Sequence, residues 1–444
     1  RGITIKASAV TMFHEKDGVE YQLNMIDTPG HVHFNYEVSR ALKACEGAIL
    51  LVDANQGIEA QTIANMKLAR EQGLKIIPAV TKIDLPNSRP IDAMVEMEES
   101  FGIDPDDILA VSGKTGENVD EMLDAVIERV PPPQGDPDGP LRALVFDSHY
   151  NQYRGVVVFV RVFDGEMSTG DRITMMGAGE KHEIGELGMF LPGMTPRDHL
   201  GTGEVGYLTA GIKNVREVTV GDTVTRQDNP ATTPLEGYKE PKPMVFCGLY
   251  PEDNDDFDLL RDALDKLWLN TSSFVYQEEA SEALGFGFRC GFLGPLHMEI
   301  IQQRLERENN MNIIQTAPNV TYKVEKTDGT VEEIDRPSKL PDRGVIEKIF
   351  EPWVRVDIIL PGEFVGNVMK LVERRRGEYD TTRFFSDNRA RLLVDMPLSE
   401  MAYGFFDKLK SVTRGHGTMD YELLGERESN LVKVDILVNE TPVD

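Results

Sequence analysis

The sequence of 444 residues is short of cysteine and has no long apolar run, and each shortage excludes a class of protein. The three cysteines, Cys45, Cys247 and Cys290, lie far apart without C-x-x-C spacing, so we expect neither a disulfide framework nor a zinc site, and a reducing cytoplasm fits. The best apolar stretch, Ala48–Val52, is far shorter than the roughly 20 residues that cross a bilayer. Because no basic segment followed by an apolar block opens the chain, we expect no secretory signal and no transmembrane segment.

Positive charge is also scarce, with 47 Lys and Arg residues against 75 Asp and Glu and a formal net charge of −28. This balance disfavours a general nucleic-acid binder, because such proteins are basic as a rule. Cations nevertheless gather in the last hundred residues, where either a phosphate-contacting face or ordinary solvated helix ends would account for them. They are Arg374, Arg375, Arg376, Arg383, Arg389, Arg391, Lys408, Lys410 and Arg414.

The remaining composition is that of a globular protein, with 40% hydrophobic and 27% charged residues, and the length predicts three or four domains. Residues 1–131 alternate short apolar runs with helical periodicity, which is typical of a doubly wound α/β domain. We expect helices near 34–45 and 119–130, the second capped by Asn118 with Glu121. The expected strands are Tyr21–Ile26, Ala48–Val52, Lys75–Val80 and Ile108–Val111.

Proline-rich linkers at 131–137 and 228–243 enclose a segment of different texture. Residues 141–228 carry β-branched runs such as Val156–Val162, separated by glycines, and predict a β-barrel.

The last two segments, 244–325 and 344–440, share the order β-α-β-β-α-β, which is the split ferredoxin-like pattern. In the first we expect strands at 244–249, 273–278, 285–291 and 312–324, and helices at 257–269 and 296–308. In the second we expect strands at 353–360, 379–385, 391–396 and 418–424, and helices at 363–373 and 401–412. The predicted fold is therefore multidomain: α/β, then a β-barrel, then two α+β modules.

The tetrad Asp27-Thr28-Pro29-Gly30 lies between a predicted strand and a predicted helix. A strand-end Asp can hold the water shell of Mg²⁺, and a following Gly lets a backbone N–H approach a terminal phosphate closely. Upstream, Thr4 offers a hydroxyl that can ligate Mg²⁺ and bond the γ-phosphate, then release after hydrolysis. D-x-x-G alone is common by chance, so this site depends on the motifs that follow it.

Two further motifs, Thr81-Lys82-Ile83-Asp84 and Ser112-Gly113-Lys114, also follow predicted strands. The Asp84 carboxylate can accept both N1–H and the exocyclic amine of guanine, a donor pair that adenine lacks. The stem of Lys82 can lie along the base and ribose, and a backbone N–H of the Ser112-Gly113-Lys114 segment can bond the guanine O6. Each residue has a structural alternative, as a turn, capping or loop residue. Their order along successive strand ends favours a GTP site.

The pair His31 and His33 has two readings. A metal site would need further ligands, and none is arranged for it. His31 directly follows Gly30, so it is better placed to orient a water molecule for in-line attack on the γ-phosphate. His33 is expected at the surface or at the start of a helix.

These motifs resemble those of translational GTPases, in which R-G-I-T-I, D-T-P-G-H, [N/T]-K-x-D and S-[A/G]-K are the switch I, switch II and guanine motifs. Within that group the chain is similar to the LepA, or elongation factor 4, family over essentially all its length. The stretches that distinguish it are 283–294 (A-L-G-F-G-F-R-C-G-F-L-G), 296–301 (L-H-M-E-I-I) and Arg414-Gly415. The direct passage between the two ferredoxin-like modules also fits.

The resemblance implies a ribosome-bound GTP hydrolase with GTP/GDP and Mg²⁺, proposed to move tRNAs backward after faulty translocation or to assist ribosome assembly. It implies ribosomal RNA and proteins as partners, tRNA indirectly, and a cytoplasmic monomer with peripheral association at the inner face of the cell membrane. By motif, Thr4 would ligate Mg²⁺, Asp27 would hold it through water and His31 would be catalytic. The guanine would be surrounded by Thr81, Lys82, Ile83, Asp84, Ser112, Gly113 and Lys114.

The chain departs from the family pattern in several places. It begins beyond the phosphate-cradling loop G-x-x-x-x-G-K-[ST], and the family's basic C-terminal domain also lies outside it. We therefore expect a sequence truncated at both ends and a polypeptide that is inactive alone. Thr81 stands for the usual Asn and Gly113 for Ala, changes that keep the guanine contacts; His33 stands for Asp and Pro295 for Leu.

Two alternatives remain open at this point. A nucleotide-independent ribosome-binding module would not bind GTP even with its natural N-terminus restored. An elongation factor G-like translocase would carry a further domain between the ferredoxin-like modules, and its absence argues against that class.

Overall fold

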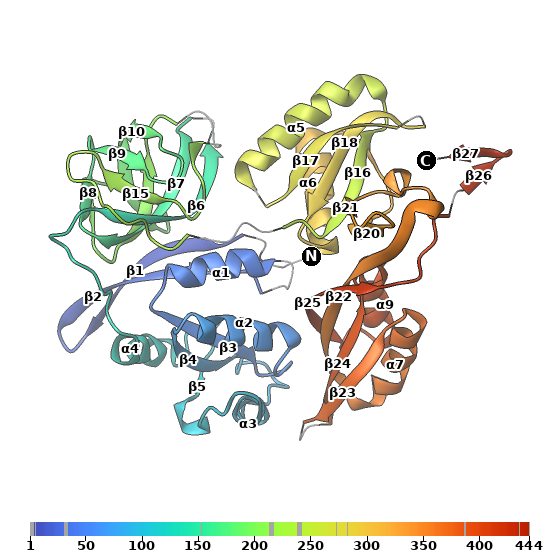
Figure 1. Ribbon diagram of the computed structural model, residues 1–444. Helices are drawn as coiled ribbons and strands as arrows, with labels where there is room; N and C mark the ends of the chain where they lie inside the picture. The colour runs from blue at the N-terminus through green and yellow to red at the C-terminus, as the bar shows by residue number, and fades with distance from the viewer. Residues whose placement is uncertain are drawn as a thin grey trace. The chain divides into compact units, whose positions relative to one another are not determined.

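The computed structural model describes residues 4, 6–30, 34–151, 153–212, 217–237, 242–271, 273–281, 283–385, 388–434 and 436–443 (Figure 1). The chain divides into two compact units, Arg1–Glu240 and Pro241–Asp444, and each is described by itself.

The first unit begins with the α/β domain, whose parallel sheet has the order β3-β4-β5. Three strands expected from the sequence are present, although β5 is only two residues long. The helices expected after residues 34 and 118 are α1 and α4. Val38 and Leu42 of α1 pack with Ala69 of α2 in a buried cluster, so the apolar spacing of these helices is explained by packing. The elements are β3 (Gly47–Asp53), β4 (Lys75–Thr81), β5 (Leu109–Ala110), α1 (Asn35–Lys43), α2 (Ala60–Glu71), α3 (Pro90–Phe101) and α4 (Val119–Arg129).

The strand expected at 21–26 is present as β2 (Val19–Asp27), but it does not belong to the described parallel sheet. It pairs antiparallel with β1 (Ser8–Lys16), a strand that the sequence analysis missed. The turn between them is Asp17-Gly18, with φ angles of 54° and 79°. Two residues with positive φ favour a tight hairpin, and Asp-Gly is the sequence typical of it. The hairpin brings Ser8 directly opposite Asp27.

The segment expected as a β-barrel forms an eight-stranded antiparallel sheet of order β10-β9-β15-β6-β7-β14-β11-β12, with a separate pair β13-β8. The expected strand at 156–162 lies within β7, most of whose residues are buried. The strands are β6 (Arg142–Asn151), β7 (Gly155–Asp164), β8 (Glu166–Ser168), β9 (Arg172–Met175), β10 (Lys181–Glu183), β11 (Glu186–Leu191), β12 (Gly193–Arg197), β13 (His199–Gly201), β14 (Val205–Thr209) and β15 (Thr223–Arg226).

A buried cluster joins this sheet to the α/β domain. Ala9 of β1 and Ala44 at the end of α1 pack with aromatic and aliphatic side chains of β6, β7, β11 and β14. The two domains of the first unit therefore share a core at the β1 and α1 side. The barrel residues are Phe146, Val157, Phe190, Val205 and Tyr207.

The second unit opens with the first ferredoxin-like module, whose sheet has the order β17-β18-β16-β19. Helices α5 and α6 cover one face of it, over a core that includes Leu260, Phe288 and Ile301. This is the expected β-α-β-β-α-β order. The elements are β16 (Val245–Pro251), α5 (Phe257–Asn270), β17 (Val275–Ser281), β18 (Gly285–Phe292), α6 (Pro295–Asn309) and β19 (Ile313–Gln315).

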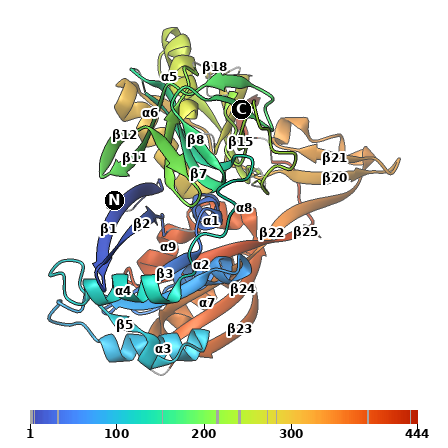
Figure 2. The ribbon, with the colours of Figure 1, turned by 90° about the vertical axis from the view of Figure 1, so that its left-hand side faces the viewer.

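The strand expected at 312–324 is wrong in its extent. It is two strands, β19 and β20 (Tyr322–Lys326), and β20 pairs with β22 (Ile346–Pro361) of the next module. With β21 (Val331–Ile334), β20 forms a hairpin that projects from the end of β22 (Figure 2). The apolar run was correct, but its pairing partner lies beyond a long connection that local patterning does not reveal.

The second module repeats the strand arrangement of the first, with β25 and β24 on either side of β22 and β23 outside β24. The helix expected at 401–412 is interrupted, because Gly404 has a φ of 65° and separates two shorter helices. The elements are α7 (Val365–Arg374), β23 (Glu378–Phe384), β24 (Arg389–Pro397), α8 (Leu398–Ala402), α9 (Phe405–Val412) and β25 (Thr418–Glu428), followed by a short pair, β26 (Ile436–Val438) and β27 (Thr441–Val443).

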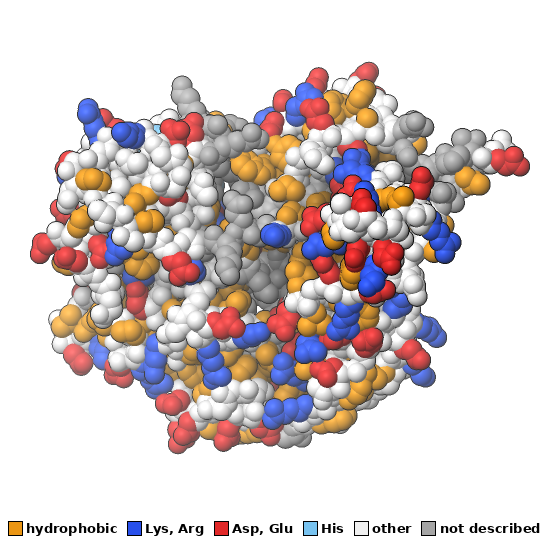
Figure 3. Space-filling view, in the orientation of Figure 1, with side chains coloured by type: hydrophobic (Ala, Val, Ile, Leu, Met, Phe, Trp, Pro, Cys, Tyr) orange, Lys and Arg blue, Asp and Glu red, His pale blue; other side chains and the backbone are white. Residues whose placement is uncertain are grey.

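The late cations are partly neutralised within the fold. Arg375 pairs with Glu400 at 3.2 Å, Arg376 with Glu351 at 2.7 Å and Arg391 with Asp357. Acidic and basic side chains are interspersed over the face of the molecule in Figure 3. For these three arginines, intramolecular pairing accounts for the clustering.

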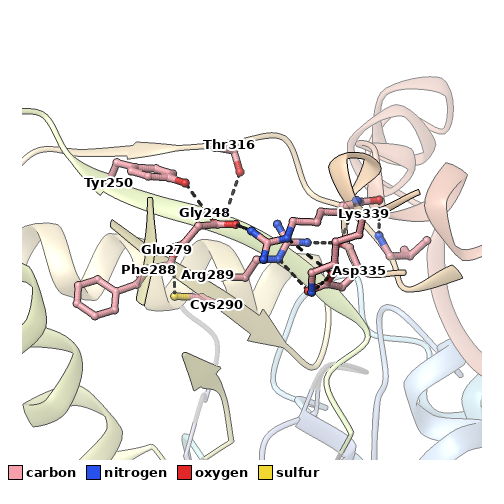
Figure 4. Close-up of polar contacts among 12 residues, drawn as sticks. Gly248, Tyr250, Glu279, Phe288, Arg289, Cys290, Thr316, Asp335 and Lys339 are labelled. Carbon is pink, nitrogen blue, oxygen red and sulfur yellow. Dashed lines mark hydrogen bonds and ion pairs between the residues drawn. The ribbon is translucent and has the colours of Figure 1, made fainter. Parts of the chain in front are cut away.

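The glycine-rich stretch 283–294 has a structural explanation in β18. A Cβ atom on Gly287 would lie 2.4 Å from the Tyr250 ring, so that ring lies against bare backbone. From the same strand, Arg289 donates to the carbonyl of Asp335, and Lys339 lies 2.8 Å from the Asp335 carboxylate (Figure 4). The segment after β21 is thereby attached to the first module.

Candidate functional site

The candidate site is built at the carboxyl ends of the parallel strands. Asp53 ends β3, Thr81 ends β4, and Ala110 ends β5. In register, Asp53 lies opposite Thr81, and Val80 lies opposite Ala110. Because parallel strands end at the same edge of the sheet, the loops after them converge there.

A hydrogen bond joins the two motifs that the sequence singled out. The Ser112 hydroxyl donates to Oδ1 of Asp84 over 2.7 Å and accepts the backbone N–H of Thr115 over 3.1 Å. Ser112 is fully buried, whereas the Asp84 side chain keeps 12% of its exposure. The serine therefore fixes the carboxylate at the surface of the site, with part of it open to a ligand.

Lys114 completes this group from the opposite side. Its ammonium lies 4.0 Å from Oδ2 of Asp84 and its side chain is 81% exposed, so it can swing over a ligand. Gly113, between the two, has no atom within 4 Å of the position a Cβ would take. The backbone at Gly113 is accordingly accessible, as expected for an N–H that contacts a base.

Lys82 points back to β3 rather than outward. Its ammonium bonds Oδ2 of Asp53 over 2.7 Å, and its own φ is 62°, in the left-handed region. Burial opposes ionisation of Asp53, but the hydrogen bonds from Lys82 and from the Asn55 backbone outweigh it and hold its pKa below the usual value. Asp53 was not expected from the sequence; its place at a strand end, level with Thr81, was the available clue.

The loop around Ile83 is held by its own hydrogen bonds. Ser88 Oγ donates to the Ile83 carbonyl over 2.9 Å, and the Leu85 N–H donates to the Lys82 carbonyl over 3.2 Å. These contacts fix the turn that presents Asp84.

Asn118 does not cap α4 as expected. Its φ is 59°, and no side-chain capping hydrogen bond forms. Its amide instead donates to the carbonyl of Ala110 over 2.7 Å, at the end of β5. The residue therefore stabilises the Ser112–Lys114 loop rather than the helix.

The other expected half of the site is separate in its contacts. Asp27 is exposed at the end of β2, Thr28 is half-buried, Pro29 is buried and Gly30 is exposed with open space beside it. Among the described residues, no hydrogen bond or ion pair joins Asp27–Gly30 to the Asp84 group. Thr4 is exposed. His31 and His33 lie outside the described residues.

Metal ligands other than these are not gathered elsewhere in the described part of the chain. Within those residues no three His, Cys, Asp or Glu side chains are grouped to hold a metal ion. Among the helices that the structure describes, none is long and apolar enough to cross a membrane.

The arrangement around Asp84 can discriminate between purines. A fixed carboxylate accepts hydrogen bonds and donates none, so it favours a ring edge carrying two N–H donors over one carrying an acceptor. The exposed ammonium of Lys114 and the open backbone of Gly113 lie next to it and can meet an oxygen-bearing edge.

Comparison with known families agrees with this geometry. Residues 1–132 match the elongation factor Tu GTP-binding domain, residues 155–225 match elongation factor Tu domain 2, and residues 348–437 match the elongation factor G C-terminus. A crystal structure of a Thermus thermophilus protein superposes with a TM-score of 0.63 at 17% identity, covering 96% of this chain and 89% of that one. The last likeness concerns the fold alone.

Close relatives among curated proteins share one description. Elongation factor 4 of Limosilactobacillus reuteri (strain DSM 20016) is 53% identical over 445 residues, covering 100% of this chain and 73% of the relative. Elongation factor 4 of Desulforudis audaxviator (strain MP104C) is 54% identical over 439 residues, covering 99% of this chain and 73% of the relative. With identity of this level along its whole length, the chain belongs to the elongation factor 4 family of translational GTPases.

Proposed function

We propose that the loops after β4 and β5 bind the guanine base of GTP, with Asp84 as the residue that selects it. The carrying observation is the 2.7 Å hydrogen bond from Ser112 to Asp84, which fixes the carboxylate before any ligand arrives. A group held in its bound geometry loses little entropy on binding, so it discriminates well. The protein is a GTPase of its family, and this assigns the base contacts to particular residues.

Each neighbour of Asp84 has a part in this proposal. The Asp84 carboxylate accepts N1–H and the exocyclic amine of guanine, and a backbone N–H at Gly113 meets the guanine O6. The stem of Lys82, drawn to Asp53, and the stem of Lys114 flank the base. Thr81 and Ile83 contribute the strand end and the turn that carry Asp84.

The phosphate end lies at the other motif. The register of the β1–β2 hairpin supports the pairing of Thr4 with Asp27, because Ser8 lies opposite Asp27 and Thr4 is only four residues before it. Four extended residues span at most about 14 Å, so the hydroxyl of Thr4 stays within that reach of the Asp27 end of β2. Hydroxyl and carboxylate oxygens suit Mg²⁺, and the exposed Asp27 carboxylate is available to its water shell.

When bound, Mg²⁺ would neutralise charge on the terminal phosphates. Thr28, Pro29 and Gly30 would shape the backbone next to the γ-phosphate, and the open space at Gly30 fits a close approach. His31 is assigned to orient the attacking water molecule, on its position in the chain directly after Gly30.

In the cell, the protein is proposed to act as a ribosome-dependent GTPase of the elongation factor 4 type. The barrel and the ferredoxin-like modules would contact ribosomal RNA and proteins, and tRNA would be affected indirectly. Backward movement of tRNAs and assistance in ribosome assembly are the two roles proposed, for a cytoplasmic monomer that also associates with the inner face of the membrane.

The test uses the protein produced from its complete gene. Replacing Asp84 by Asn turns one acceptor oxygen into a donor, and xanthine carries an oxygen where guanine carries its amine. We expect Asp84→Asn to weaken GTP binding by about 10- to 100-fold, as for a bidentate base contact worth about 1–3 kcal/mol, and to improve binding of xanthosine triphosphate.

Asp120→Asn is the matched control, because Asp120 is an exposed carboxylate in the first turn of α4. Fluorescence titration with labelled GDP and competition by each triphosphate measure the effect. Equal preferences in the two variants would contradict the assignment of Asp84. If the unmodified protein bound ribosomes but no guanine nucleotide, the alternative of a nucleotide-independent ribosome-binding module would stand. The elongation factor G-like alternative is disfavoured, since the chain passes directly from β19 to β20.

A further inference from the structure

A charged cluster joins the α/β domain to the β-barrel sheet within the first unit. Asp147 of β6 pairs with two cations of the other domain: its Oδ1 lies 3.2 Å from Nη2 of Arg40, and its Oδ2 lies 3.2 Å from Nζ of Lys6. Lys6 also donates to the Ser148 carbonyl over 3.4 Å. A single barrel carboxylate thus bridges two segments of the α/β domain.

Arg40 is the more buried of the two cations. Its side chain is 9% exposed, and it donates to the Phe146 carbonyl from Nε over 3.1 Å and from Nη2 over 2.9 Å. Lys6 is 40% exposed, and Asp147 is 13% exposed. An ion pair taken out of water is stabilising only with good geometry, and removal of one partner leaves the other charge uncompensated. Loss of Lys6 from this cluster would therefore change the state of Asp147.

A second carboxyl adjoins the cluster from α1. Burial raises the pKa of Glu37 to about 7, with Arg40 opposing that rise. Arg40 thus lies between two carboxyl groups, one on its own helix and one on the barrel. Asp147 is the one it contacts across the domain boundary.

The positions of Lys6 and Arg40 in the chain give the cluster its significance. Lys6 is two residues after Thr4, the proposed ligand of Mg²⁺ and the γ-phosphate. Arg40 is on α1, which begins five residues after Gly30. The two segments proposed to sense the terminal phosphate therefore both end on Asp147.

We propose that Asp147 is a positioning residue for GTP hydrolysis, which holds Lys6 and Arg40 so that the segments of Thr4 and Gly30 are ordered together against the barrel. This inference rests on the proposed GTP site. Two extended residues span at most about 7 Å, so any larger displacement of Thr4 pulls Lys6 with it. Release of Thr4 after hydrolysis then removes one of the two cations from Asp147.

The coupling also runs in the opposite direction. Two sites linked through one equilibrium affect each other reciprocally. A partner that shifts β6 relative to α1 would move Asp147 away from Lys6 and Arg40 and loosen the phosphate-sensing segments. A partner that holds β6 in place would favour the ordered, hydrolysing arrangement. The barrel thereby influences turnover at a site it does not contact.

The experiment uses the protein from its complete gene with purified ribosomes. Asp147→Asn keeps the shape of the side chain and removes its charge, and Lys6→Met keeps the stem of the lysine and removes its ammonium. For each variant and for the double variant, the ribosome-stimulated kcat and the KM for GTP are measured, together with the Kd for labelled GDP and the thermal midpoint.

Glu46→Gln is the matched control. Glu46 pairs with the buried Arg161 of β7 at the same domain boundary, away from the cluster of Lys6, Arg40 and Asp147. It therefore reports on a general loosening of the interface. We expect each test variant to lower stimulated kcat by about 2- to 30-fold, the usual range for residues that couple two sites, with the Kd for GDP changed less than about twofold.

The double variant should be no slower than the slower single variant, because both changes remove the same contact. Additive losses in the double variant, or an equal loss in Glu46→Gln, would overturn the role of Asp147. If the unmodified protein showed no ribosome-stimulated GTP hydrolysis, the proposed function itself would fail, and that result is distinct from normal stimulation that is indifferent to Asp147.

Discussion

Arg161→Met is the change that best tests how the first unit is held together. Arg161 lies on β7 with its side chain 3% exposed, donates to the Ala44 carbonyl over 2.5 Å and pairs with Glu46. Its guanidinium also lies 4.7 Å from the centre of the Phe163 ring. Methionine preserves the apolar stem but leaves the carbonyl and the carboxylate without their cation.

The magnitude follows from these contacts. Removing one partner of a buried pair costs about 3–5 kcal/mol. Glu46 is 24% exposed and regains some water, and the Nε of Arg161 has no acceptor among the described residues. Both facts reduce the cost, so we expect a loss near the lower end, about 3 kcal/mol.

Hydrogen exchange followed by mass spectrometry is the suitable assay, because both tryptophans lie in the second unit. Peptides from β6 and β7 should exchange roughly 100-fold faster, since about 1.4 kcal/mol corresponds to a factor of ten. Arg154→Met is the control, because Arg154 and Glu186 are 37% and 34% exposed, and such pairs contribute less than about 1 kcal/mol. Equal exchange in the two variants would refute the reasoning.

Two further predictions concern the second unit. Burial lowers the pKa of His297 to about 4, so the unfolded state binds more protons between about pH 6.5 and 4; stability should fall by up to about 3 kcal/mol as pH drops through that window, and a pH series of urea unfolding should give a shallower slope for His297→Gln than for the native protein. Gly287→Ala would place a Cβ 2.4 Å from the Tyr250 ring and 2.6 Å from the Leu249 carbonyl; we expect a loss of about 1–3 kcal/mol, measured by the fluorescence of Trp268, whereas Gly366→Ala in α7 meets no atom within 4 Å and should stabilise by up to about 1 kcal/mol.

Much of the guanine site could be predicted because its determinants are local. Asp84 and Ser112 each follow a short apolar run, and buried parallel strands have few other sequence signatures. Once the strands are placed, their ends must converge, so the meeting of the two motifs follows from topology. The outcome at Asp84 and Ser112 is the contact that this reasoning implies.

Other features depend on contacts that no local pattern reveals. The pairing of β20 with β22 and the bridge from Arg40 to Asp147, 107 residues apart, are set by tertiary packing. Asn118 was misassigned because the capping pattern assumes an extended backbone, whereas its φ is 59°. The β1 strand is a different case, since the Asp17-Gly18 turn was a usable hairpin signal.

The continuity of β22 limits how the second unit can move. At roughly 3.3 Å per residue, its 16 residues extend over about 50 Å. One end pairs with β20, and the other with β24 and β25. Asp335, just after the β20–β21 hairpin, is attached to the first module through Arg289. Independent hinging of the two ferredoxin-like modules would have to break this strand's ladder or that anchor, so a load applied to either module is delivered to the other as a rotation of one stiff body.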